Sequence, residues 1–101
     1  MKTILITGSE GLCGESLYHY FKTKKYRVIG VDKKKLKNSR GIRFNLIKHL
    51  DAKKFPKKVD YIMHLAADID QNDNYPLKTL RNNLLATFNT LWYANQVKAK
   101  C

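Results

Sequence analysis

The stretch TILITGSEGLCG, residues 3–14, decides the fold of this chain. Its first half belongs to a short apolar segment, 2–7, that predicts a buried strand cut off by glycine. Apolar residues at three- and four-residue spacing predict a helix over 12–24. Three evenly spaced glycines, Gly8, Gly11 and Gly14, span the turn between them and the start of the predicted helix. We expect a tight turn into a helix N-terminus, where free N–H groups and the helix dipole favour a diphosphate; the alternative is an ordinary strand-to-helix turn.

The second part of the signal is Asp32, which ends another predicted strand, 27–32, and stands 18 residues beyond Gly14. An acid at this place can accept hydrogen bonds from an adenosine ribose and disfavours a 2′-phosphate. The lysines that follow, at 33–35, would partly offset that repulsion. Strand, glycines, helix, strand and acid therefore favour a dinucleotide site for NAD over NADP.

The rest of the chain continues the alternation of strands and helices. We expect a strand over 41–46, a short helix over 46–55, a strand over 59–67, a polar loop over 68–75 and a long helix over 76–99. In the long helix one apolar stripe runs through Leu80, Leu84, Thr87, Phe88, Leu91 and Trp92. This order predicts one α/β domain, a partial Rossmann fold whose parallel sheet has the strand order 3-2-1-4 and helices on both faces.

The net charge of +12 comes from one region of the chain. Fifteen of the twenty basic residues lie in 22–58, with only two acids. Clustered lysines could release counterions from a nucleic acid, but aromatic residues do not alternate with them as on a base-stacking surface. A solvated lysine-rich surface is therefore favoured, and nucleic acid is not expected as a partner.

The remaining bulk features narrow the setting of the protein. No apolar run approaches the roughly 20 residues that a membrane-spanning helix needs, and the N-terminus lacks the pattern of a signal peptide. The two cysteines, Cys13 and Cys101, form no metal spacing and no disulfide framework. We expect no membrane partner, no bound metal and a cytoplasmic location.

Four separated motifs agree in order and spacing: T-G-x-x-G-x-x-G at 7–14, Asp32, D-Y-I-M-H-L-A-A at 60–67 and N-N-L-L-A-T at 82–87. Together they resemble the extended short-chain dehydrogenases/reductases, the NAD-dependent epimerase/dehydratase family, although Ala86 replaces a usual glycine. Pro76-Leu77 ahead of Asn82-Asn83 is most similar to UDP-glucose 4-epimerases, but sister sugar-nucleotide epimerases and dehydratases differ little in this half.

The resemblance implies roles for individual positions. The pyrophosphate would be surrounded by Gly8, Gly11, Leu12, Cys13 and Gly14. Asp32 would bind the adenosine ribose, and Asn45, beside Leu46, replaces an aspartate that usually touches the adenine amine. The central part of NAD would lie over Leu65, Ala66 and Ala67. From the long helix, Asn82 or Asn83 would face the cofactor; for Asn83 a helix-packing hydrogen bond is an equal alternative.

Catalysis in this family uses a Tyr-x-x-x-Lys pair and a nearby Ser or Thr. The same spacing occurs here at Tyr18/Lys22 and Tyr20/Lys24, but both pairs fall in the first predicted helix, far from the expected nicotinamide. His64 resembles a structural histidine at a strand end. The loop acids Asp68, Asp70 and Asp73 lack calcium-loop spacing and suggest a solvated loop near the substrate.

The resemblance implies that these 101 residues are the N-terminal part of an NAD-binding domain, and that the family's next strand begins right after Lys98. Catalytic residues and a sugar-nucleotide site would belong to a full-length enzyme. The free edge of a four-stranded sheet could support self-association. A non-catalytic nucleotide-binding or protein-interaction module is the alternative function.

Overall fold

Four parallel strands form one sheet in the computed structural model, which describes residues 1–50, 53–68 and 76–101. The elements in chain order are β1 (Thr3–Thr7), α1 (Leu12–Thr23), β2 (Arg27–Asp32), β3 (Gly41–Arg43), β4 (Tyr61–His64) and α2 (Pro76–Val97). The strand order is β3-β2-β1-β4, which confirms the predicted 3-2-1-4 arrangement.

The strand register brings the predicted site residues to one edge of the sheet. Thr7 of β1 pairs with Val31 of β2 on one side and with His64 of β4 on the other. The carboxyl ends of these parallel strands therefore meet, with Asp32 one residue beyond Val31. In doubly wound sheets ligands bind at this edge.

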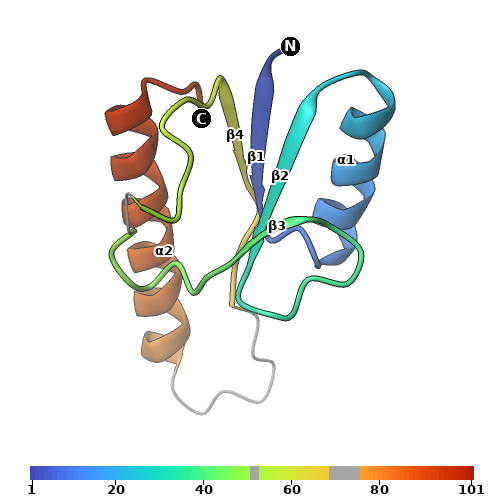
Figure 1. The fold of residues 1–101 in the computed structure, drawn as a ribbon. Helices are drawn as coiled ribbons and strands as arrows, with labels where there is room; N and C mark the ends of the chain where they lie inside the picture. Colours follow the sequence, from blue (N-terminus) through green and yellow to red (C-terminus); the bar gives the residue numbers. More distant parts are fainter. Residues whose placement is uncertain (51–52, 69–75) are drawn as a thin grey trace.

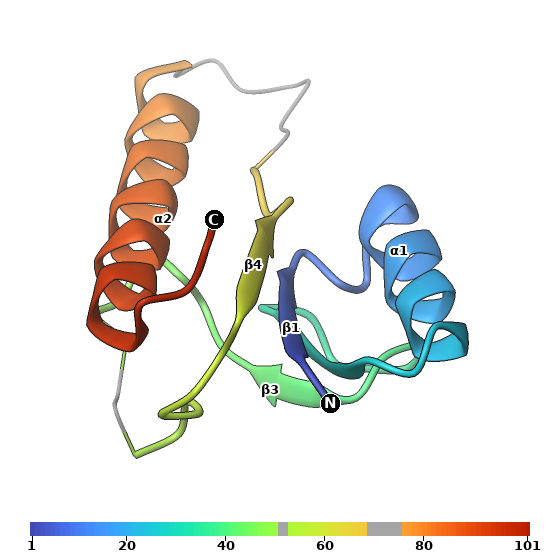
Figure 2. The same cartoon turned by 90° about the horizontal axis from the view of Figure 1, so that it is seen from above.

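The two helices cover opposite faces of the sheet, α1 beside β1 and β2 and α2 beside β4 (Figures 1 and 2). Each face has its own apolar core. Under α1 the buried residues are Ile4, Ile6, Tyr18 and Val28. Under α2 they are Leu5, Val31, Leu46, Leu50, Phe55, Val59, Ile62, Ala86, Tyr93 and Ala94. All five residues of β1 are buried, because the strand lies between the two layers.

The predicted helix over 46–55 is wrong for the described residues 46–50 and 53–55, which form turns and irregular backbone. The buried amide of Asn89, from α2, donates to the carbonyls of Leu46 (2.7 Å) and Lys48 (3.0 Å). These carbonyls are thus satisfied by a tertiary contact. The apolar side chains of this segment fill the α2 core without helical order.

Two predicted strands are shorter than expected. The strand expected over 41–46 ends at Arg43, and the one expected over 59–67 covers only Tyr61–His64. Just beyond β4 the Leu65 N–H still donates to the Thr7 carbonyl of β1 at 3.1 Å. The N–H groups of Leu65 and Ala66 also donate to the Thr7 hydroxyl, at 3.0 and 3.1 Å.

The apolar residues of the predicted stripe of α2 face away from the sheet, whereas Thr87 of the same stripe bonds to His64 of β4. Leu80, Leu84, Phe88 and Leu91 are each more than half exposed. The face that packs on the sheet carries smaller or polar side chains, namely Ala86, Asn89, Thr90, Tyr93 and Ala94. Among the described residues no helix is long and apolar enough to span a membrane.

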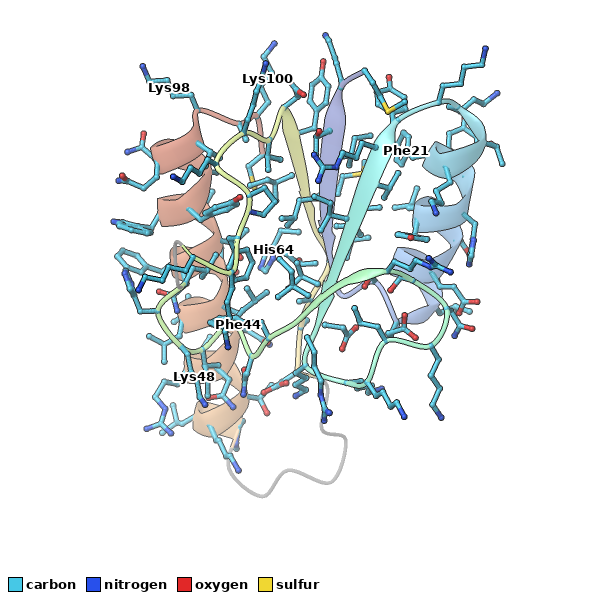
Figure 3. All side chains as sticks on the ribbon, viewed as in Figure 1. Phe21, Phe44, Lys48, His64, Lys98 and Lys100 are labelled. Carbon is cyan, nitrogen blue, oxygen red and sulfur yellow. The ribbon has the colours of Figure 1, made fainter. Side chains whose placement is uncertain are left out.

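The chain after α2 returns to the sheet beside β4 (Figure 3). The N–H of Lys100 donates to the carbonyl of Asp60 (3.0 Å), and its carbonyl accepts from Ile62 (2.7 Å). Lys100 therefore begins to pair in parallel with Tyr61, at the place where the sequence predicts the next strand. Lys100 thus hydrogen-bonds to the outer edge of β4, as a single bridge opposite Tyr61.

Candidate functional site

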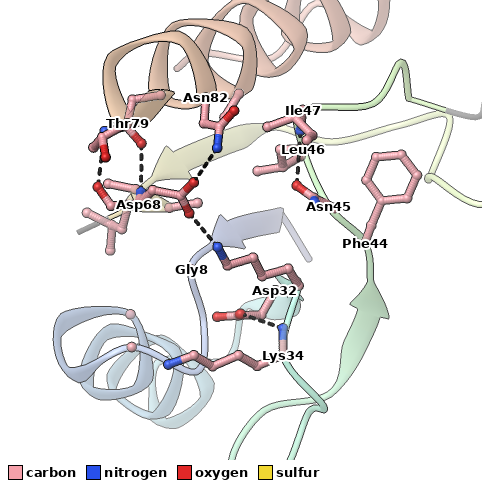
Figure 4. Close-up of a pocket in the computed structure, with 18 of the residues that line it drawn as sticks. Gly8, Asp32, Lys34, Phe44, Asn45, Leu46, Ile47, Asp68, Thr79 and Asn82 are labelled. Carbon is pink, nitrogen blue, oxygen red and sulfur yellow. Dashed lines mark hydrogen bonds and ion pairs between the residues drawn. The ribbon is translucent and has the colours of Figure 1, made fainter. Parts of the chain in front are cut away.

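A pocket of about 810 Å³ lies along the carboxyl-terminal edge of the sheet, between the glycine turn, the segments after β2, β3 and β4, and the first turns of α2 (Figure 4). It lies at the edge where dinucleotides bind in doubly wound sheets.

All the site residues predicted from the sequence line this one pocket: Gly8, Gly11, Leu12, Cys13, Gly14, Asp32, Asn45, Leu46, Leu65, Ala66, Ala67, Asn82 and Asn83. The sequence did not assign a site role to several further lining residues: Lys33, Lys34, Phe44, Ile47, Asp68, Lys78, Thr79 and Ala86. Most of them directly follow a strand or begin α2, a position that could have identified them.

The glycine turn is shaped by two positions that tolerate no side chain. Gly8 has a φ of +75°, and a Cβ there would lie 2.8 Å from the backbone nitrogen of Ala66. A Cβ on Gly14 would lie 1.9 Å from the carbonyl oxygen of Gly8. The turn, the segment after β4 and the start of α1 are therefore in backbone contact, which makes the floor of the pocket.

The N-terminus of α1 opens on this floor. Gly11 is its N-cap and makes no side-chain capping hydrogen bond, and Leu12, Cys13 and Gly14 of the first turn line the pocket. The first N–H groups of a helix have no partners within the helix. Together with the positive end of the helix dipole, they favour an anion here.

Asp32 lies beside the glycine turn and is held by two backbone groups. One carboxylate oxygen accepts the N–H of Glu10 and the other accepts the N–H of Lys34, both at 2.9 Å. Each carboxylate oxygen can accept more than one hydrogen bond, so Asp32 keeps acceptor capacity toward the pocket.

The wall opposite the glycine turn comes from the segment after β3. The Asn45 side-chain oxygen accepts the N–H of Ile47 at 3.3 Å, while Leu46 is buried against the α2 core (Figure 4). Asn45 thus begins a local turn whose side chains form an apolar wall with Phe44.

The paired asparagines in the first turns of α2, Asn82 and Asn83, both contact Asp68. The Asn83 amide accepts the Asp68 N–H (2.6 Å) and donates to its carbonyl (3.2 Å), which favours the helix-packing interpretation of Asn83. Asn82 donates to the Asp68 carboxylate at 2.9 Å. The Lys33 ammonium pairs with the same carboxylate, and this hydrogen bond, followed by that of Asn82, lowers the pKa of Asp68.

His64 belongs to a network behind the pocket. The Thr7 hydroxyl accepts two N–H groups, from Leu65 and Ala66, so its own proton points to Nδ1 of His64 at 2.7 Å. Nε2 then carries the imidazole proton and donates to Thr87 at 3.1 Å. Burial lowers the pKa of His64, in keeping with this neutral form.

The two Tyr-x-x-x-Lys pairs lie away from the pocket. Tyr18 is buried under α1, where its hydroxyl accepts the N–H of Arg40 at 3.0 Å, and Tyr20 is exposed. Of the three loop acids only Asp68 belongs to the described residues; Asp70 and Asp73 lie outside them. No group of metal-binding side chains is found among the residues that the structure describes.

The sheet order, the glycine turn and the acid that ends β2 define a dinucleotide-binding Rossmann domain. A model of the NAD dependent epimerase/dehydratase family matches residues 4–100. The chain belongs to this family. No significant match is found among curated proteins.

Solved structures show the same fold. The chain is similar to ADP-L-glycero-D-manno-heptose-6-epimerase from Helicobacter pylori (29% identity, TM-score 0.82, 97% of this chain and 37% of that one). It is also similar to a UDP-galactose 4-epimerase (24% identity, TM-score 0.77, 96% of this chain and 35% of that one). A third structure is a short-chain dehydrogenase/reductase superfamily protein from Agrobacterium tumefaciens with bound NAD (20% identity, TM-score 0.78, 96% of this chain and 30% of that one). The chain thus spans about a third of the length of these proteins.

Proposed function

We propose that the pocket binds NAD, with the pyrophosphate at the start of α1, the adenosine ribose at Asp32 and the adenine beside Asn45 and Leu46. The central part of the cofactor would lie over Leu65, Ala66 and Ala67. One observation carries this proposal: the eleven residues that the sequence assigns to these parts of the cofactor line a single pocket, together with Asn82 and Asn83.

The residues present fit the chemistry of a dinucleotide. Gly14 allows the start of α1 to pack on the Gly8 carbonyl, which a Cβ would approach to 1.9 Å, and the N-terminus of α1 has no side-chain cap, so its N–H groups are open to a diphosphate. Asp32 supplies acceptors for ribose hydroxyls and a negative charge that opposes a 2′-phosphate. This arrangement supports NAD rather than NADP.

We further propose that the chain is the cofactor-binding part of an enzyme acting on a sugar nucleotide. Bound NAD would supply a hydride acceptor for a sugar hydroxyl. The family match and the resemblance to two nucleotide-sugar epimerases support this step. Reading the coding sequence beyond Cys101 for a Ser or Thr and a Tyr-x-x-x-Lys pair tests it; their absence would contradict the enzymatic role and leave NAD binding intact.

Thermal unfolding of the 101-residue chain tests NAD binding. A ligand at a hundredfold excess over its Kd stabilises the folded state by about 2.7 kcal/mol, so NAD should raise the Tm. Asp32→Asn should shrink this rise. The matched control is Asp60→Asn, because Asp60 bonds to Thr3 at the opposite edge of the sheet. An unchanged Tm, or an equal rise in the Asp32 variant, would contradict the proposal.

A further inference from the structure

Glu10, within the glycine turn, holds the lysine-rich loop that follows β2. Its carboxylate accepts the backbone N–H groups of three successive residues: Lys37 (3.0 Å), Asn38 (3.0 and 3.2 Å) and Ser39 (2.8 Å). The Ser39 hydroxyl also hydrogen-bonds to it. Successive N–H groups that converge on one point form an anion-binding nest. Here the anion is a side chain of the protein itself.

The nest is built on buried groups. Ser39 also bonds to the hydroxyl of Ser9 at 2.8 Å, and both serines are almost fully buried. A Cβ on Gly30 would lie 2.5 Å from the Ser9 hydroxyl oxygen, so the glycine of β2 leaves room for this pair. Partial burial opposes ionisation of Glu10, but the hydrogen bonds of Ser39, Lys37 and Asn38 outweigh it and lower its pKa to about 2. The carboxylate is therefore charged at neutral pH.

The same residue touches the expected ribose acid. The Glu10 N–H donates to the Asp32 carboxylate at 2.9 Å, while its side chain fills the nest. The loop of residues 33–40, which contains the nest, also carries five cationic side chains. Three N–H donors surrounded by lysines would make a good phosphate site beside the ribose, if no carboxylate occupied it.

We propose that Glu10 is a specificity-determining residue: its carboxylate takes the place of a phosphate in the nest of residues 37–39 and thereby excludes dinucleotides that carry a 2′-phosphate. The inference rests on the proposed NAD site. It explains how a loop with so many lysines is compatible with an NAD site, because the backbone N–H groups that could bind a phosphate already bond to Glu10. A second negative charge next to Asp32 adds repulsion.

Calorimetric titration of the chain with NAD and with NADP tests this role. In Glu10→Ala the nest is empty, and we expect the ratio Kd(NADP)/Kd(NAD) to fall about tenfold, the effect of one charge-assisted hydrogen bond. The matched control is Glu15→Gln in the first turn of α1, which removes one negative charge and leaves the nest intact. It should leave the ratio unchanged.

The outcomes separate the two proposals. If Glu10→Ala binds NAD with an unchanged ratio, or if Glu15→Gln lowers the ratio equally, the role of Glu10 is wrong and the NAD site stands. If the wild-type chain does not bind NAD, the proposed function itself fails.

A measurement on the wild-type chain does not depend on how the variants fold. In amide NMR spectra, the signals of Lys37, Asn38 and Ser39 should move no more on addition of NADP than on addition of NAD, because Glu10 occupies their N–H groups. Larger shifts of these three signals with NADP would overturn the inference.

Discussion

The hydroxyl of Thr7 donates to Nδ1 of His64 over 2.7 Å, and this bond joins the carboxyl ends of β1 and β4 under the pocket. The same hydroxyl accepts the N–H groups of Leu65 and Ala66. One buried oxygen thus fixes both the histidine tautomer and the path of the segment expected to lie under the cofactor.

Replacing this hydroxyl should destabilise the fold. Thr7→Val keeps the shape of the side chain but removes the acceptor of the Ala66 N–H and the donor to Nδ1 of His64; the Leu65 N–H keeps its bond to the Thr7 carbonyl at 3.1 Å. We expect the free energy of unfolding to fall by about 1–3 kcal/mol, measured by urea denaturation. Thr23→Val, at the exposed end of α1, is the control and should change it by less than about 0.5 kcal/mol. Equal effects would contradict the network.

Stability should depend on pH through His64. Unfolded histidine titrates near pH 6.5, and burial lowers the pKa of His64 in the folded state. As pH falls below about 6.5, His64 takes up a proton in the unfolded chain before it does so in the folded one. The free energy of unfolding should therefore decrease as pH falls toward the folded pKa. The slope should not exceed about 1.4 kcal/mol per pH unit.

Denaturation of the wild type and of His64→Gln between about pH 5 and 7 measures this dependence, and the slope should disappear in the variant. The exposed His19 and His49 are present in both proteins, so they cannot account for a difference in slope between them. A slope that survives the substitution would show that another group causes it.

The glycines of the turn should differ sharply in their tolerance of alanine. Gly14→Ala forces a Cβ against the carbonyl oxygen of Gly8 and should cost about 1–3 kcal/mol or more. In Gly11→Ala the nearest atom is 3.3 Å away, so the fold should persist with a loss below about 1 kcal/mol. Circular dichroism with thermal melting compares the two, and a larger loss for Gly11→Ala would contradict the packing.

The Asn89 side chain should determine the path of residues 46–48. Asn89→Ala leaves the carbonyls of Leu46 and Lys48 without their donor, and we expect a loss of about 1–3 kcal/mol in urea denaturation. Asn95→Ala, on the exposed side of the same helix, is the control and should be nearly neutral. Similar losses in both would mean that helix propensity, not the amide, matters.

Local patterns predicted the sheet order and the pocket because they are carried by neighbouring residues: β-branched runs, a glycine turn and an acid at a strand end. The described residues 46–50 and 53–55 were mispredicted as helix; two of their carbonyls, those of Leu46 and Lys48, bond to Asn89, some 40 residues away. Glu10 is an ordinary loop residue in the sequence, and its role depends on a loop 27–29 residues later. Long-range polar contacts of this kind leave no periodic signal.

The most direct test of NAD binding is to follow the backbone amide signals of the labelled chain by NMR during an NAD titration. The largest shifts should fall on Gly8, the first turn of α1, Asp32 and residues 65–67. Lys98, just beyond the end of α2, should not move. No saturable shifts, or shifts spread over the lysine-rich region 22–58 with the glycine turn unaffected, would contradict it.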